Sequence, residues 1–192
     1  MEGTLRSLPI STQLQKIANM AASDPEMVFT TLVHLIDVEF LKKSFHEIRV
    51  GGAVGVDKVN WNEYASNLNE NLISLHERLV SGTYRAQAVR RSWIDKDDGK
   101  KRPLGILVIE DKVVQRAAKT LLEAVYEQDV TGYFDNINHK LLMDVIKKRV
   151  NDGGLLRLIG KWLNVGVLDG EDLFYPEKGI RQLAESYLSH IS

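Results

Sequence analysis

The spacing of apolar residues at threes and fours, which is typical of amphipathic helices, runs through most of the chain. The spacing predicts helices over residues 12–22, 27–48, 61–80, 109–126, 138–150 and 155–165. Ser23-Asp24-Pro25-Glu26 is a helix start signal for the second of these, and Ser81-Gly82 is a stop signal for the third. The aromatic residues of 61–80 fall on the apolar stripe, so we expect them in the core.

Two strands are predicted between the helices. Tyr84–Lys96 and Lys100–Ile106 have strand character, and Asp98-Gly99 between them is a strong tight-turn signal. Pro103 has no N–H for a ladder hydrogen bond, so the returning strand should lie at a sheet edge. A further short strand is expected over 129–137. The expected fold is therefore α/β (α+β), helix-rich toward the N-terminus.

A glycine-rich loop over 51–57 separates two of the predicted helices. Three glycines in five residues permit unusual backbone angles and would let a nucleic-acid backbone approach closely. The loop is not a phosphate-binding P-loop, because no Gly-Lys-Ser/Thr follows it.

Charge is unevenly distributed, although the 192 residues hold 25 Lys+Arg against 26 Asp+Glu. Residues 85–119 carry ten basic and five acidic side chains, whereas both flanking segments are net acidic. A basic island indicates an anionic partner, but a solvated strand face explains the same charge and is favoured from charge alone. On a hairpin, such cations could follow phosphates. The cations concerned are Arg90, Arg91, Lys96, Lys100, Lys101 and Arg102.

Several classes of protein are excluded or disfavoured. The absence of Cys excludes disulfides and cysteine-ligated metals. No apolar run approaches the roughly 18 residues of a membrane span, and the first residues lack the pattern of a secretory signal, so a cytoplasmic protein is expected. The five His are scattered without metal-ligand spacing, and no Gly-x-Ser-x-Gly is present.

The segment 129–137 is the candidate acidic centre, with carboxylates at Asp129 and Asp135. Mg²⁺ prefers oxygen ligands and is often shared between a few carboxylates and a substrate phosphate. A turn aspartate and an exposed edge carboxylate are the simpler interpretation from these residues alone.

Ordered motifs resemble the reverse transcriptases encoded by group II introns. Gly55-Val56-Asp57, Gly82-Thr83-Tyr84-Arg85 and Val89-Arg90-Arg91 resemble the fingers, as do 98–106 and 110–117. Residues 132–139 (Gly-Tyr-Phe-Asp-Asn-Ile-Asn-His) resemble the first palm motif, and parts of 161–180 resemble the approach to the next palm motif. The resemblance covers roughly residues 35–182.

The resemblance implies a right-hand polymerase with fingers and a partial palm. It implies a helical extension over 1–37, fingers over 38–128, a partial palm over 129–182 and a tail unlike the family over 183–192. It makes Asp129 the first catalytic carboxylate and a Mg²⁺ ligand, and places Phe134 near a bound dNTP. The basic hairpin would contact nucleotide phosphates or the template, and the partners would be intron RNA, RNA template and DNA primer.

Departures from the family pattern change the expected activity. The family's Tyr-x-Asp-Asp turn is absent, since the only Asp-Asp pair, Asp97-Asp98, lies in the hairpin. Glu127-Gln128-Asp129 replaces a family segment, and the residues after Gln182 diverge. A truncated protein that is inactive alone is therefore expected, because one carboxylate cannot hold two Mg²⁺ ions. A non-catalytic intron-RNA-binding module and a decayed mobile-element remnant remain alternatives, and the oligomeric state is left open.

Overall fold

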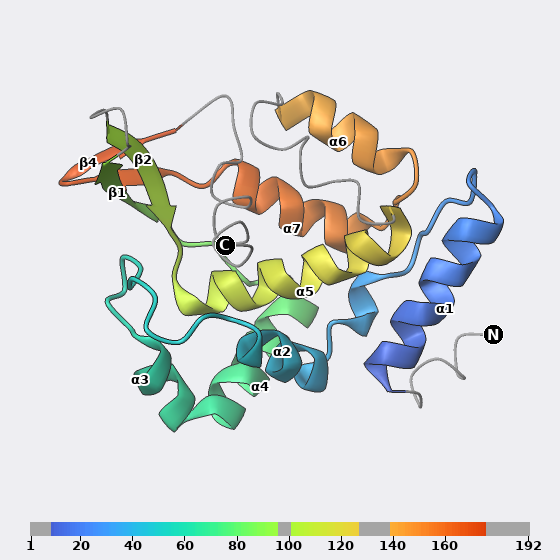
Figure 1. Cartoon of the computed structure of the whole chain (residues 1–192), viewed down its shortest axis with the longest axis horizontal. Coiled ribbons are helices and arrows are strands. Elements are labelled where there is room, and N and C mark those ends of the chain that lie inside the picture. The colour runs from blue at the N-terminus through green and yellow to red at the C-terminus, as the bar shows by residue number, and fades with distance from the viewer. Residues whose placement is uncertain (1–8, 96–100, 127–138, 176–192) are drawn as a thin grey trace.

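The fold is mixed α/β, with a helical body and a small sheet at one end of it (Figure 1). The computed structural model describes residues 9–95, 101–126 and 139–175, with Arg102 described by its backbone only. The helices are α1 (Ile10–Ser23), α2 (Val38–His46), α3 (Trp61–Ser66), α4 (Leu68–Val80), α5 (Ile109–Tyr126), α6 (His139–Lys147) and α7 (Gly153–Leu163), with a 3₁₀ turn at Val33–Leu35.

Helix α5 runs through the middle of the body (Figure 1). It contacts α1 and α2, and α2 in turn contacts α4. Its buried positions include Val113, Val114, Ala117 and Leu121, which recur at threes and fours as the sequence predicts. One continuous apolar core extends from α1 to α7 around these residues. No helix in the described ranges is long and apolar enough to cross a bilayer.

The sheet has four strands in the order β2-β1-β3-β4. These are β1 (Val89–Asp95), β2 (Lys101–Ile106), β3 (Val167–Asp169) and β4 (Asp172–Phe174). Strand β1 pairs antiparallel with β2 and parallel with β3, and β3 pairs antiparallel with β4. Strand β2, with Pro103, lies at an edge, which confirms the expectation drawn from the missing N–H.

The prediction of one helix over 27–48 is wrong. The helix begins only at Val38, where Asp37 accepts a hydrogen bond from the Phe40 N–H at 2.8 Å. The preceding residues pair instead with a distant segment, since Phe29 exchanges backbone hydrogen bonds of 2.8 Å with Arg149 and Asn151. Ser23 is the last residue of α1, and Asp24-Pro25-Glu26 follows it without starting a helix. A long-range contact thus overrides local helical spacing.

Three smaller differences concern boundaries. The helix predicted over 61–80 is divided at Asn67, whose backbone (φ −125°, ψ 37°) is not helical, into α3 and α4. Its first half begins at a capping box between Asn60 and Glu63. Strand β1 begins at Val89 rather than at Tyr84, which is buried beside the helices. The expected turn at Asp98-Gly99 and the expected strand over 129–137 lie outside the described residues.

Candidate nucleic-acid interface

Strands β1 and β2 carry Arg90, Arg91, Lys101 and Arg102 of the basic island. In its register Arg91 faces Gly105, Trp93 faces Pro103 and Asp95 faces Lys101. Side chains of paired residues lie on one face of a sheet, and the face alternates along each strand. Arg91, Trp93 and Lys101 therefore share one face, and Arg90 and Ile94 share the other. Lys101 is exposed.

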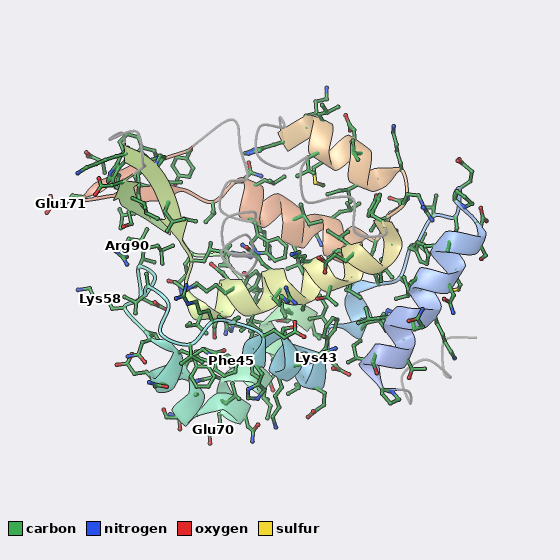
Figure 2. The ribbon with its side chains drawn as sticks, viewed as in Figure 1. Lys43, Phe45, Lys58, Glu70, Arg90 and Glu171 are labelled. Carbon is green, nitrogen blue, oxygen red and sulfur yellow. The ribbon has the colours of Figure 1, made fainter. Side chains whose placement is uncertain are left out.

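Arg90 binds the glycine-rich loop rather than extending into solvent. Its Nε and Nη2 donate to the Val54 carbonyl oxygen at 3.0 and 2.7 Å. Figure 2 shows Arg90 between the sheet and the loop that carries Lys58. From α5, the Lys112 Nζ donates to the Ala53 carbonyl oxygen at 3.1 Å, and burial lowers the pKa of this lysine. Arg90 and Lys112 thus hold the glycine-rich loop against the start of β1 and the start of α5.

Gly55 allows the loop to lie against the chain that enters α5. A Cβ at position 55 would lie 2.7 Å from the N and Cα atoms of Val108, which are backbone atoms and cannot rotate away. We therefore expect Gly55→Ala to lower the free energy of unfolding by about 1–3 kcal/mol, the range for overpacking. Urea denaturation measures this change.

Gly52→Ala is the matched control in the same loop, since its Cβ would meet only the Arg49 carbonyl oxygen at an ordinary 3.6 Å. This control should change stability by less than about 0.5 kcal/mol, as surface substitutions usually do. Equal effects of the two alanines would contradict the close approach at Gly55.

Arg91 lies at the centre of an aromatic group that joins β1 to β4. Its Nη1 forms an ion pair with the Asp169 carboxylate at 3.2 Å. Its guanidinium carbon lies 5.8 Å from the ring centroid of Trp93 and 5.8 Å from that of Phe174. Such distances are those of cation–π contacts. Asp169, Trp93 and Phe174 were not among the residues expected at the site.

A sequence signal for this second hairpin was present. Asp169-Gly170 lies between alternating residues, and the structure places Gly170 (φ 65°) in a two-residue turn between Asp169 and Asp172. Glycine favours this positive φ, which tight hairpin turns require. Local sequence does not reveal the parallel pairing of β1 with β3, which brings Phe174 close to Arg91.

A buried polar network joins the segment that precedes β1 to helices α5 and α7. The Tyr84 hydroxyl donates to the Asp111 carboxylate at 2.5 Å and accepts from the Trp162 indole N–H at 3.1 Å. The Gln87 N–H donates to the other Asp111 oxygen at 2.9 Å. Burial raises the pKa of Asp111 to about 6, although both of these hydrogen bonds favour its charged form. Burial also raises the pKa of Tyr84.

A second polar group lies next to the first. The Arg78 Nη2 donates to Glu110 at 2.7 Å, and the Tyr64 hydroxyl donates to the same carboxylate at 3.5 Å. Burial, followed by the nearby charge of Glu110, raises the pKa of Tyr64. These contacts join α3 and α4 to the first turn of α5. Their role in the interface is to fix the body from which the sheet projects.

The remaining predicted site residues are not placed together by the structure. Asp129, Phe134, Lys96 and Lys100 lie outside the described residues, and the side chain of Arg102 is not described. Across 9–95, 101–126 and 139–175, no three His, Asp or Glu side chains form a group that could hold a metal ion. The Mg²⁺ role of Asp129 stays a prediction.

Comparison with known proteins gives the relationships of the chain. No family model matches it. Protein YkfC of Escherichia coli K12 is 29% identical over 204 aligned residues, which cover 83% of this chain and 54% of YkfC. Group II intron-encoded protein LtrA of Lactococcus lactis subsp. cremoris is 31% identical over 136 residues, 52% of this chain and 23% of LtrA. The chain is similar to group II intron-encoded proteins.

A yeast intron protein extends the similarity over more of the chain. The putative COX1/OXI3 intron 2 protein of Saccharomyces cerevisiae is 21% identical over 201 residues, 85% of this chain and 23% of that protein. The chain therefore spans about half the length of YkfC and about a quarter of the intron-encoded relatives. The sequence resemblance to the group II intron proteins is supported at this level, whereas the roles of individual residues stay predictions.

Proposed function

We propose that the chain is a protein of the group II intron reverse transcriptase/maturase family that binds intron RNA and does not synthesise DNA by itself. The observation that supports this most is the β1–β2 hairpin, a cationic arm at the end of the helical body (Figure 1). The similarity to LtrA and to the yeast intron protein gives the arm its expected ligand. The cytoplasm remains the expected location.

RNA binding would begin at the hairpin because its cations are close together in sequence. Lys101 is exposed on β2, and Lys100 and Arg102 are its neighbours in the chain. Phosphate contacts by Lys and Arg release counterions, so affinity falls as salt rises. Arg90 and Arg91 contribute differently, since one binds the loop and the other is paired with Asp169. They shape the arm, and the proposed phosphate contacts are those of the three basic residues from 100 to 102.

The absence of DNA synthesis follows from the carboxylates. The sequence has no Tyr-x-Asp-Asp, and Asp129 alone would have to hold the metal ions that reverse transcription uses. Electrostatic stabilisation by those ions is the main catalytic contribution in phosphoryl transfer. A full set of palm carboxylates is therefore required, and one carboxylate falls short of it.

Primer extension tests the catalytic part of this proposal. With an RNA template, an annealed DNA primer, dNTPs and Mg²⁺, the purified chain should yield no extended product above the level without protein. A retroviral reverse transcriptase under the same conditions shows that the template and primer are competent. Robust full-length DNA made by the chain would refute the proposed inactivity, and an Asp129→Asn variant would then show whether that carboxylate is responsible.

A further inference from the structure

Two large aromatic side chains are exposed on one face of the sheet. Trp93 of β1 is 50% exposed and Phe174 of β4 is 48% exposed. Trp93 lies two residues from Arg91 and from Asp95, the partner of Lys101, so these side chains share one face of the sheet. Phe174 lies on the same face, because it pairs with Val167 and Val167 pairs with Val89 of β1. Exposed aromatic surface of this kind marks an interaction site.

The cation between the rings gives this surface a particular chemistry. Arg91 is held by Asp169, so its guanidinium is oriented before any ligand arrives. It lies 5.8 Å from the centroids of both rings. Nucleobases stack on aromatic rings and on arginine guanidinium planes, and every base offers a π-face. The three side chains together form a surface of the size and character of a base-stacking site.

We propose that Trp93, Arg91 and Phe174 form a platform on which unpaired bases of RNA stack. The proposal rests on the proposed function and deepens it, since it states that the arm takes single-stranded rather than paired RNA. Lys101, exposed on the same face and opposite Asp95, would contact the phosphate of a stacked nucleotide. Paired bases have their faces covered by neighbours, so a duplex would contact only the cations.

The charges around the platform favour RNA bases over an apolar protein surface. The Arg91–Asp169 pair is partly buried in the middle of the patch. A dry protein interface would complete that burial, and desolvating an ion pair costs more than its attraction often returns. A stacked base leaves the edges of the pair in water. Glu171, at the tip of the sheet in Figure 2, and Asp172, the first residue of β4, would keep the phosphates on the Lys101 side.

The experiment compares a 5′-labelled single-stranded RNA 20-mer with its duplex by fluorescence anisotropy at 50 mM salt. Trp93→Ala and Phe174→Ala should each weaken binding of the single strand by about 5-fold or more, the low end of a base stack. Trp93→Phe should retain most of the affinity. Ile94→Ala, which removes an exposed apolar side chain from the opposite face of the same strand, is the matched control and should bind as the wild type does.

A second readout reports stacking directly. The chain has three Trp, and Trp162 is 6% exposed whereas Trp93 is 50% exposed. Single-stranded RNA should quench the intrinsic tryptophan fluorescence of the wild type, and Trp93→Phe should abolish most of that quenching while still binding. A purely structural role of Trp93 would not produce this pattern.

Several outcomes would overturn the platform. Wild-type affinity in both alanine variants, or equal losses in Ile94→Ala, would remove it while leaving RNA binding through the cations intact. Equal affinity of the wild type for single-stranded and duplex RNA would also rule out the platform and leave RNA binding through the cations intact. A dimer in sedimentation velocity that Trp93→Ala dissociates would assign the face to a second copy of the chain. No RNA binding by the wild type would refute the proposed function itself, and the platform with it.

Discussion

Asp152→Ala is expected to lower the free energy of unfolding by about 3–5 kcal/mol, a large share of a typical domain's stability. Asp152 caps α7 by accepting from the N–H groups of Gly154 and Leu155 at 2.8 and 3.0 Å. Its second oxygen accepts from the N–H groups of Leu32 and Val33. The residue is 3% exposed, so alanine would leave several buried donors without a partner. Each such donor costs about 1–3 kcal/mol.

Urea denaturation of the purified variant measures this loss, and Asp37→Ala is the matched control. Asp37 also caps a helix, but its side chain accepts from the Phe40 N–H and the residue is exposed. Loss of that cap should cost about 1 kcal/mol. Similar losses in the two variants would contradict the special position of Asp152. A wild type without a cooperative transition would instead favour a decayed remnant.

The stability of the protein is expected to depend on pH through Asp111. The folded protein holds this proton with a pKa of about 6, against an ordinary value of 3.8, because the carboxyl group is buried. A raised pKa means that the folded state binds the proton more tightly than the unfolded chain does. The stability that this group contributes is therefore present below about pH 4 and is lost as pH rises through about 6. Complete loss amounts to about 3 kcal/mol.

Asp111→Asn removes this titration and gives the comparison that isolates it. The Asn oxygen can still accept from the Tyr84 hydroxyl, while the Gln87 N–H loses its acceptor. The stability of the wild type minus that of the variant should fall by about 2 kcal/mol between pH 4 and pH 7. Urea midpoints at four pH values measure the difference. A difference that stays constant with pH would show that Asp111 has an ordinary pKa.

The sequence predicted the elements that depend on local pattern. Helix α5 has the predicted bounds, because its apolar residues recur regularly at threes and fours along its whole length. The β1–β2 pairing and the edge position of Pro103 followed from turn and ladder chemistry. The false helix over 27–37 shows the limit, since its backbone is held by residues about 120 positions away.

The candidate site shows the same limit. The cations of the hairpin were evident from composition, but their partners were not. Arg90 is directed to Val54 and Arg91 to Asp169, contacts that join residues 36 and 78 positions apart. The aromatic platform depends on the β1–β3 pairing and on the short turn at Gly170. Only the second of these has a local signal in the sequence.

We expect the chain to bind RNA through the cations of the β1–β2 hairpin. Lys100→Ala/Lys101→Ala/Arg102→Ala removes these charges and spares Arg90 and Arg91, which have structural contacts. Lys16→Ala/Lys43→Ala/Lys147→Ala is the matched control, because it removes the same charge from exposed positions on three helices.

The measurement is binding of single-stranded group II intron RNA by anisotropy across a salt series. Wild-type affinity should fall about 20-fold between 50 and 200 mM salt, as expected if roughly three phosphates are neutralised. The hairpin variant should bind about 10-fold more weakly at 50 mM salt and show a shallower salt dependence, whereas the control triple should resemble the wild type. Equal affinities and equal salt slopes for the hairpin variant and the wild type would contradict the account.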